Sequence, residues 1–237
     1  MDGLAKILEA QTKDKEPQVI TGDWTNNISV SDMFSKDEVQ KYYDIIKEPR
    51  VTPNLNWKKG WYSDFEAKEK KETEGYWHIP LGGSDKDREE FTIEQDWVQE
   101  IWDKINLDLK VLRVYLNGHY AGEPGDIHVD GWTPDQYTII VYLNPYIKPE
   151  DGGTIEFWTP NITPEHQATA MDTPYGPMGS SEPNIIRAFW PKPGRVVTFD
   201  ARIPHVARGL HEASKHFRIS LVFKASKTAW LLSHTVI

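Results

Sequence analysis

One short stretch of the sequence places two metal-binding side chain types close together. His128 and Asp130 are separated by a single residue. On an extended backbone, residues i and i+2 point to the same side, so both side chains can reach one metal ion. A second histidine from a distant strand would complete a set of two histidines and one carboxylate. Such a set leaves positions open on the metal, as a non-haem Fe(II) oxygenase requires.

His205 is the preferred candidate for the third ligand. It follows a predicted strand over residues 196–199, and Arg218 and Ser220 open another predicted strand thirteen residues further on. Arg218 and Ser220 share one side of that strand, where a guanidinium fork and a hydroxyl suit a carboxylate held at a fixed distance from the metal. His211 is the alternative ligand, but it lies only seven residues before Arg218, too few for the usual turn between two strands.

In this order, these residues resemble the Fe(II)- and 2-oxoglutarate-dependent dioxygenases, and within them the prolyl-4-hydroxylase-like branch. The resemblance covers residues 109–224, about half of the chain. The spacing from His205 to Arg218 is a few residues longer than in close prolyl hydroxylases, and a longer loop over residues 207–216 would absorb it. The motifs that carry the resemblance are His128-x-Asp130, Tyr142-Leu-Asn144, Asp151-Gly-Gly153, Pro193-Gly194, His205 and Arg218-x-Ser220.

The resemblance implies a double-stranded β-helix of eight strands, the jelly-roll or cupin-like core, and a role for each matching residue. It implies Fe(II), 2-oxoglutarate as cosubstrate and O₂, with ascorbate as an accessory reductant. Family members that halogenate have Gly or Ala at the position of Asp130, so the carboxylate favours a hydroxylase. The implied metal ligands are His128, Asp130 and His205; Arg218 would bind the distal carboxylate of 2-oxoglutarate, helped by Tyr142 and Ser220. No catalytic residue is expected beyond the metal ligands.

Four further side chains are candidates for contact with the substrate or for support of the ligands: Trp132, Arg113, Tyr115 and Asn117. Trp132 follows Asp130 on the same side and could form a wall of the substrate entrance. Arg113 could face the barrel and bind an anionic substrate, although an arginine at a strand edge is usually solvated. Tyr115 and Asn117 either line the cosubstrate pocket or fill the barrel.

The elements that must position these residues change character along the chain. Before residue 108 the sequence predicts two amphipathic helices, one after a capping box at 35–38 and one after a capping box at 92–95. After residue 108 it predicts short strands rich in β-branched and aromatic residues. This order predicts a mainly β fold with flanking helices (α+β). The predicted strands are 109–116, 137–143, 154–158, 185–190, 196–199 and 217–223.

We expect a single dioxygenase domain over residues 1–237. In it, residues 1–108 form an N-terminal helical support, residues 109–224 form the β-helix core, and residues 225–237 form a C-terminal tail. One long segment, 159–184, interrupts the strands and holds five prolines. A loop of this length inside a compact domain is usually functional, and we expect a lid over the metal.

Composition excludes several classes of function. The chain has no cysteine, which excludes disulfides, thiolate zinc sites and a cysteine nucleophile. A formal net charge of -9 disfavours nucleic acid as a partner. The chain shows no apolar run of membrane-spanning length and no secretory signal at its start, so we expect a cytoplasmic protein whose substrate is a peptide or small molecule. Its oligomeric state is not predicted.

The sequence therefore predicts an Fe(II)/2-oxoglutarate-dependent oxygenase that hydroxylates a prolyl residue of a peptide or protein, or a free amino-acid-like small molecule. The alternative is a cupin-like metal- or ligand-binding protein without redox activity, which would have no use for Arg218 and Ser220. A zinc hydrolase is a third interpretation, because two histidines and an aspartate are also zinc ligands. It lacks an obvious glutamate base beside them.

Overall fold

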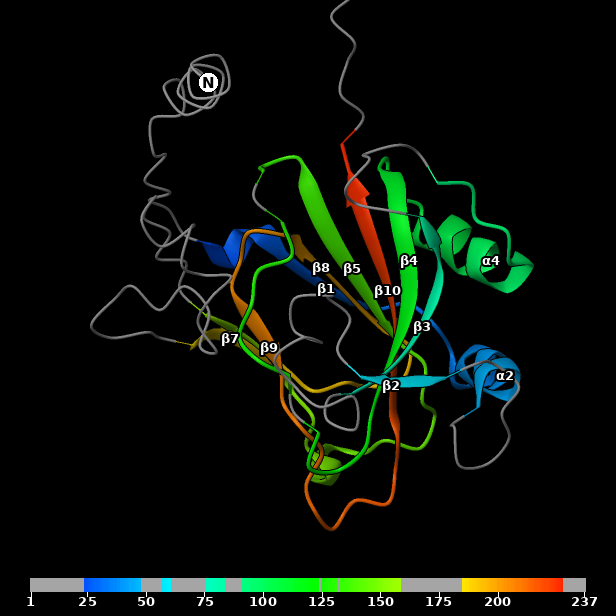
Figure 1. Cartoon of the computed structure of the whole chain (residues 1–237), viewed down its shortest axis with the longest axis vertical. Coiled ribbons are helices and arrows are strands. Elements are labelled where there is room, and N and C mark those ends of the chain that lie inside the picture. The colour runs from blue at the N-terminus through cyan, green and yellow to red at the C-terminus, as the bar shows by residue number, and fades with distance from the viewer. Residues whose placement is uncertain are drawn as a thin grey trace, which may run out of the picture.

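Two antiparallel sheets pack against each other, and helices cover the outer side of the larger one (Figure 1). The structure is a computed structural model that describes residues 24–47, 57–60, 76–83, 91–123, 125–131, 133–158 and 185–227. The helices are α2 (Lys36–Ile46) and α4 (Asp96–Ile105), with short 3-10 turns η1 (Trp24–Asn27) and η2 (Pro149–Asp151). The strands are β1 (Ile28–Asp32), β2 (Lys58–Gly60), β3 (Tyr76–Gly83), β4 (Lys110–His119), β5 (Gln136–Tyr142), β6 (Ile155–Trp158), β7 (Ile185–Phe189), β8 (Arg195–Asp200), β9 (His205–Ala207) and β10 (Arg218–Ser226).

The order of the strands brings distant parts of the chain together. The larger sheet runs β1-β8-β5-β10-β4-β3-β2, and the smaller sheet runs β7-β6-β9. β10 therefore lies between β4 and β5, and its register pairs Ser220 with Asn117 on one side and with Tyr142 on the other. This cross-strand row, far apart in sequence, forms part of one surface between the sheets.

β10 is buried on both of its sides. Successive side chains of a strand point to opposite sides, so Ile219, Leu221 and Phe223 pack into a core beneath the helices. The even-numbered side chains, beginning with Arg218 and Ser220, point into the space between the two sheets. The same alternation in β4 and β5 gives the larger sheet an apolar outer side and an inner side that carries polar groups.

A second core closes the space between the sheets. Ile140 and Val222 of the larger sheet pack with Ile155 and Phe157 of the smaller one. The rings of Phe157 and Phe199 meet edge to face with their centroids 4.9 Å apart, a favoured aromatic geometry. These apolar walls fix the distance between the two sheets and hence the width of the polar pocket.

The mainly β architecture with flanking helices is confirmed. Each of the six predicted strands has a counterpart with ends shifted by a few residues. The segment predicted as helical support also supplies β1, β2 and β3, which the sequence analysis missed. These strands extend the larger sheet at both edges, so their stability depends on pairing with distant strands rather than on a local pattern.

Within 109–224 the described residues form seven strands and not eight, because the segment that contains His128 makes only an isolated bridge to His205.

The two predicted helices are confirmed, but only one of the predicted capping boxes is. Ser35 caps α2, its hydroxyl accepts from the backbone N–H of Glu38, and the Glu38 carboxylate accepts from the Ser35 N–H at 2.8 Å. The capping box predicted at 92–95 is wrong, because α4 starts at Asp96 and its N-cap Gln95 makes no capping bond. The backbone N–H of Phe91 donates to the carbonyl of Val111 in β4, which keeps the chain extended ahead of the helix.

Neither described helix is long and apolar enough to cross a membrane.

We expect Ser35→Ala to lower the free energy of unfolding by about 1 kcal/mol, because an unsatisfied N–H remains at the start of α2. Urea unfolding followed by circular dichroism measures the change. Ser31→Ala is the control, since Ser31 is exposed on β1 and caps no helix. An unchanged midpoint for Ser35→Ala would contradict a contribution of the cap to stability.

Candidate metal centre and adjoining pocket

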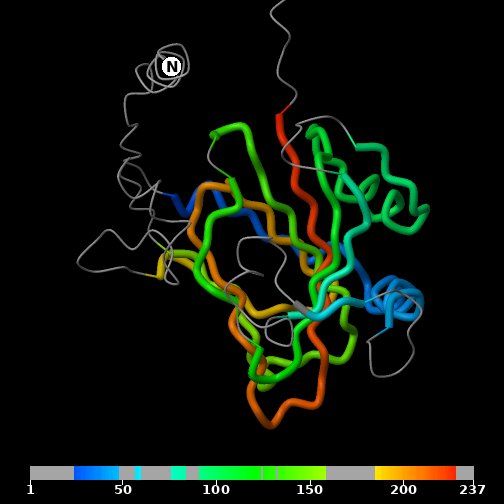
Figure 2. The backbone as a smooth tube through the Cα atoms, in the orientation of Figure 1, coloured from blue at the N-terminus to red at the C-terminus, as the bar shows by residue number. Residues whose placement is uncertain are grey.

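His128 and Asp130 lie on an irregular segment that β9 holds in place. His128 and His205 exchange two backbone hydrogen bonds, of 3.0 and 2.9 Å, and the N–H of Asp130 donates to Ala201 at 2.8 Å. Figure 2 shows this segment running beside β9. The expectation of an extended strand at His128 was therefore only partly met, yet the two-residue spacing still turns both side chains towards His205.

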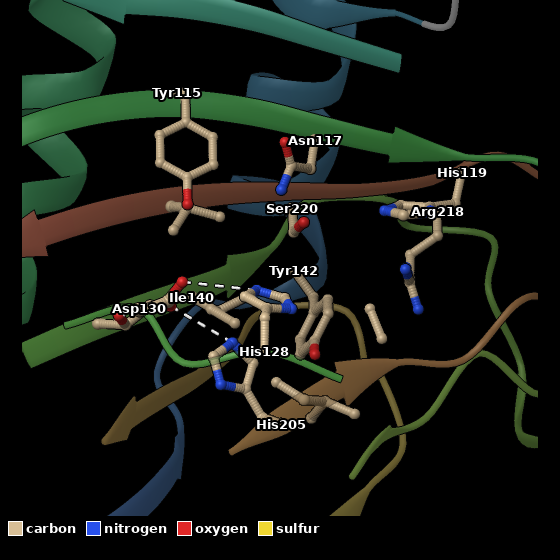
Figure 3. A pocket seen from close by; sticks show the side chains of 14 residues that line it. Tyr115, Asn117, His119, His128, Asp130, Ile140, Tyr142, His205, Arg218 and Ser220 are labelled. Atoms are coloured by element: carbon tan, nitrogen blue, oxygen red, sulfur yellow. Dashed lines mark hydrogen bonds and ion pairs between the residues drawn. The ribbon is translucent and has the colours of Figure 1, made fainter. Parts of the chain in front are cut away.

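The three side chains converge on one point (Figure 3). His128 Nε2 lies 3.5 Å from Asp130 Oδ1, and His205 Nε2 lies 3.3 Å from Asp130 Oδ2. Adjacent ligand atoms of a six-coordinate metal with bonds of about 2.1 Å would be roughly 3 Å apart. The three groups thus lie at distances that a metal ion could span with small adjustments.

Hydrogen bonds at the other ring nitrogens select the tautomer of each histidine. His128 Nδ1 lies 2.8 Å from the carbonyl of Asp126, and His205 Nδ1 lies 2.9 Å from the carbonyl of Ile203. A carbonyl can only accept, so each Nδ1 must carry the proton. In the neutral rings, both Nε2 lone pairs therefore face the Asp130 carboxylate. Two lone pairs that face a carboxylate fit a cation bound between the three groups, and backbone carbonyls commonly orient metal-binding histidines in this way.

The surroundings of Asp130 and His205 favour the protonation states that bind a metal. Burial alone would raise the pKa of Asp130, but Lys224 and the two histidines outweigh burial and hold that pKa well below its ordinary value. Burial is the main reason why the pKa of His205 is lowered. For His128, by contrast, the hydrogen bond and the charge of Asp130 outweigh burial and raise the pKa. An ionised carboxylate and a neutral imidazole are the forms that bind a metal.

A buried arginine lies in the same pocket, away from the three converging groups. The Arg218 residue is 2% exposed, and its Nη1 donates to the carbonyls of Gly153 and Arg208, both at 2.8 Å. Its Nε has no hydrogen-bond partner among the described residues. A buried donor without an acceptor is costly, and an incoming carboxylate would satisfy it. The donor set at this position therefore fits an anionic group.

Two glycine turns position the groups around Arg218. Gly153 has φ +73, a conformation that other residues rarely adopt, and an added Cβ would lie 2.7 Å from a Leu210 side-chain carbon. This turn presents the carbonyl that holds Arg218. Gly194 has φ +79, and its N–H donates to the carbonyl of Tyr142 at 2.9 Å. The glycines of the motifs at 151–153 and 193–194 are thus explained by the backbone conformation of turns that contact Arg218 and Tyr142.

The other predicted pocket residues lie on three neighbouring strands. Tyr142, Ser220, Asn117 and Tyr115 all line the pocket between Asp130 and Arg218 (Figure 3). Tyr142 is buried, and burial raises its pKa to about 12, so the phenol keeps its proton. It can therefore donate a hydrogen bond to an anion in this space.

The remaining candidates divide into three groups. The guanidinium of Arg113 stacks over the Tyr115 ring at 4.8 Å and does not line the pocket. Trp132 and the predicted lid at 159–184 lie outside the described residues. His211 packs beside Gly152, with side-chain atoms 2.9 Å from the position of an added Cβ. The structure thus brings His205, and not His211, to His128 and Asp130.

Two polar residues that contact Asp130 were missed by the sequence analysis. Thr138 and Lys224 are buried and contact Asp130. His119, for which the sequence favours a structural or supporting role rather than that of a ligand, is buried next to Arg218 in the pocket. The predicted last strand ended at Phe223, one residue too early to include Lys224. Extending the alternation from Arg218 and Ser220 along the strand would have placed Lys224 on the same side.

Comparisons with solved structures identify the fold. No family model and no curated protein sequence matches the chain. A prolyl-4-hydroxylase from Pseudomonas putida aligns over 86% of this chain and 94% of its own, with 14% identity and a TM-score of 0.50. The α-ketoglutarate-dependent epimerase SnoN of nogalamycin biosynthesis covers 84% and 78%, with 13% identity and a TM-score of 0.56. HygX from Streptomyces hygroscopicus, solved with nickel and 2-oxoglutarate, covers 89% and 88%, with 12% identity and a TM-score of 0.50. The predicted resemblance to the 2-oxoglutarate-dependent oxygenases is confirmed at the level of the fold.

We expect His128→Ala and Asp130→Ala to lose specific Co²⁺ binding while unfolding remains cooperative, because each removes one of three converging donors. Titration of the metal-free protein, followed by the visible absorption of bound Co²⁺, measures this. His211→Ala is the matched control and should bind Co²⁺ like the parent. Parental binding in both of the first two variants would exclude the three residues as the metal site.

Proposed function

We propose that this protein is an Fe(II)- and 2-oxoglutarate-dependent dioxygenase that hydroxylates a prolyl residue of a peptide or an amino-acid-like small molecule. The observation that carries the proposal is the pairing of two sites within one pocket. Three acceptors that suit a metal lie near one end, and a buried guanidinium with an unsatisfied Nε lies near the other. A ligand that chelates a metal through one end and carries a carboxylate at the other would satisfy both sites, and 2-oxoglutarate is such a molecule.

His128, Asp130 and His205 would hold the iron, which supplies the activation of O₂ and the oxidative decarboxylation of 2-oxoglutarate. Two histidines and one carboxylate with open positions are typical of such iron sites. The residues of the chain itself bind and orient. Arg218 would hold the distal carboxylate by two donors in one plane, and it remains a cation although burial lowers its pKa.

Tyr142 and Ser220 would complete the recognition of that carboxylate. Both line the pocket next to Arg218, and the β5–β10 register places them directly opposite each other. Ile140, Ile155 and Val222 form apolar walls between the two ends of the pocket. Such walls limit the access of water to the reacting groups and strengthen the electrostatic contacts inside.

The type of substrate rests on the resemblance and on the printed names of the neighbours. One neighbour is a prolyl-4-hydroxylase, whereas another is an epimerase of nogalamycin biosynthesis. The fold therefore accommodates more than one type of reaction. The retained carboxylate at Asp130 supports hydroxylation, since the halogenating members of the family replace it.

The two rival functions make different demands on the same pocket. A zinc hydrolase needs a general base next to the metal, and the described residues that line the pocket include no carboxylate besides Asp130. A binding protein without redox activity has no need for a buried arginine with an unsatisfied donor. Both observations favour the oxygenase.

Two measurements test the proposed function. Anaerobic addition of Fe(II) and 2-oxoglutarate should produce a weak visible charge-transfer band, which neither rival would show. In air, the same mixture should release succinate when the correct member of a peptide or amino-acid pool is present. A protein that binds the metal but gives neither the band nor succinate would contradict an oxygenase.

Arg218→Ala should raise the 2-oxoglutarate concentration needed for half-saturation by at least about 30-fold. Loss of one partner of a buried, hydrogen-bonded charge pair costs about 2–5 kcal/mol, at roughly 1.4 kcal/mol per tenfold change. Metal affinity should change little, because the metal-binding groups are untouched. Arg218→Lys should recover part of the loss, since the charge remains but the fork does not.

Parallel titrations with 2-oxoglutarate and with Co²⁺ separate these effects. Parental affinity for 2-oxoglutarate in Arg218→Ala would mean that the carboxylate binds elsewhere. Arg113 would then be the next candidate, and the assignment of the pocket from His205 to β10 would be wrong.

A further inference from the structure

Lys224 is a buried cation in contact with the carboxylate that would bind the metal, and the proposed function does not require it. The residue is 4% exposed, and its ammonium forms an ion pair with Asp130 Oδ2. The same ammonium donates to the hydroxyl of Thr138 at 3.2 Å, and that hydroxyl donates to Asp130 Oδ2 at 2.7 Å. Lys224, Thr138 and Asp130 thus form a closed triangle of polar groups.

Strand pairing and burial place the members of this triangle. Lys224 and Thr138 face each other across the β10–β5 register, and Thr138 is completely buried. Lys224 continues the row of even-numbered side chains that begins with Arg218, so it belongs to the inner side of the same strand. A buried charge is costly unless a partner compensates for its lost hydration. The stability of the strand alone therefore does not explain a lysine at this position.

The two oxygens of Asp130 have different surroundings. Oδ2 accepts from the Thr138 hydroxyl, contacts the Lys224 ammonium and lies 3.3 Å from His205 Nε2, whereas Oδ1 is turned to His128 Nε2 at 3.5 Å. Two donors on Oδ2 occupy the lone pairs that a metal would otherwise use there. Oδ1 remains as the oxygen that can serve as a metal ligand.

We propose that Lys224 and Thr138 are positioning residues that reserve Oδ2 of Asp130, so that the carboxylate ligates the metal through Oδ1 alone. The inference rests on the proposed function and deepens it. A carboxylate that binds through one oxygen takes one position on the metal, and two histidines take two more. Positions for a chelating cosubstrate and for O₂ then stay open, whereas a two-oxygen carboxylate would block one of them.

The ammonium also sets the charge of the site. Asp130 contributes one negative charge and Lys224 cancels it, so a bound divalent metal would keep its full charge for an anionic cosubstrate. A unit charge several ångströms away inside a protein alters the binding of an anion by on the order of tenfold or more. Lys224 therefore favours the binding of 2-oxoglutarate without needing to touch it.

The test uses Co²⁺ in the full-length protein, since its visible absorption reports the number and type of ligands. Two variants remove the donors to Oδ2: Lys224→Met replaces the ammonium by an apolar chain of similar length, and Thr138→Val replaces the hydroxyl by a methyl group. Thr138→Ser keeps the hydroxyl and is the conservative rescue. Lys227→Met removes an exposed positive charge three residues away and is the control for net charge.

In Lys224→Met and Thr138→Val we expect an altered absorption spectrum of bound Co²⁺. In Lys224→Met we also expect the 2-oxoglutarate concentration that gives half of the further spectral change to rise on the order of tenfold or more. Thr138→Ser and Lys227→Met should match the parent in both measurements. If Lys224→Met does not fold, the contrast between Thr138→Val and Thr138→Ser decides the role of the donors to Oδ2.

Three results would overturn the inference. Parental spectra and parental 2-oxoglutarate titrations in Lys224→Met and Thr138→Val, with lower stability only, would make both groups merely structural. Tighter Co²⁺ binding with a parental spectrum in Lys224→Met would mean that the ammonium only competes with the metal. A parent protein that binds no Co²⁺ would overturn the proposed function, and the inference with it.

Discussion

The burial of β10 on both sides is the constraint on which the rest of the structure depends. One side of the strand must be apolar, because it packs under α2 and α4 through Leu221 and Phe223. The other side faces the smaller sheet and carries Arg218, Ser220 and Lys224 in a single row. Since the period of a strand is two, a slip of one residue would exchange these two sets. Pairing with β4 and β5 prevents that slip and holds the pocket in one register.

The buried charges of the pocket differ in how far neighbouring groups compensate for their lost hydration. Lys224 and Asp130 neutralise each other and share the Thr138 hydroxyl. Arg218 is only partly satisfied, because Nη1 binds two carbonyls and Nε has no acceptor among the described residues. A satisfied pair is a fixed part of the framework, whereas a partly satisfied arginine gains most from a ligand. The unsatisfied Nε of Arg218 therefore points to an anion at that end of the pocket. The convergence of His128, Asp130 and His205, and not the pairing with Lys224, is what fits a cation at the other end.

The histidines show how backbone geometry prepares side-chain chemistry. The carbonyls of Asp126 and Ile203 each accept from an Nδ1, and both carbonyls lie two residues before the ring that they orient. The local chain path thus selects the tautomer before any metal arrives. The glycine turn at Gly153 acts in the same way on Arg218, since its carbonyl holds one arm of the guanidinium.

The sequence by itself determined the mainly β class, the two helices, and the two histidines, the aspartate and the arginine that meet in the pocket. Short-range patterns carry that information: the two-residue spacing of His128 and Asp130, the order of His205 and Arg218, and the capping box at Ser35. Only the tertiary structure decided that β1, β2 and β3 join the larger sheet, because edge strands depend on partners far away in the chain. It also decided that Lys224 reaches Asp130, since the contact crosses from β10 to an irregular segment more than ninety residues earlier. No local pattern encodes such a contact, because it arises from strand order and register.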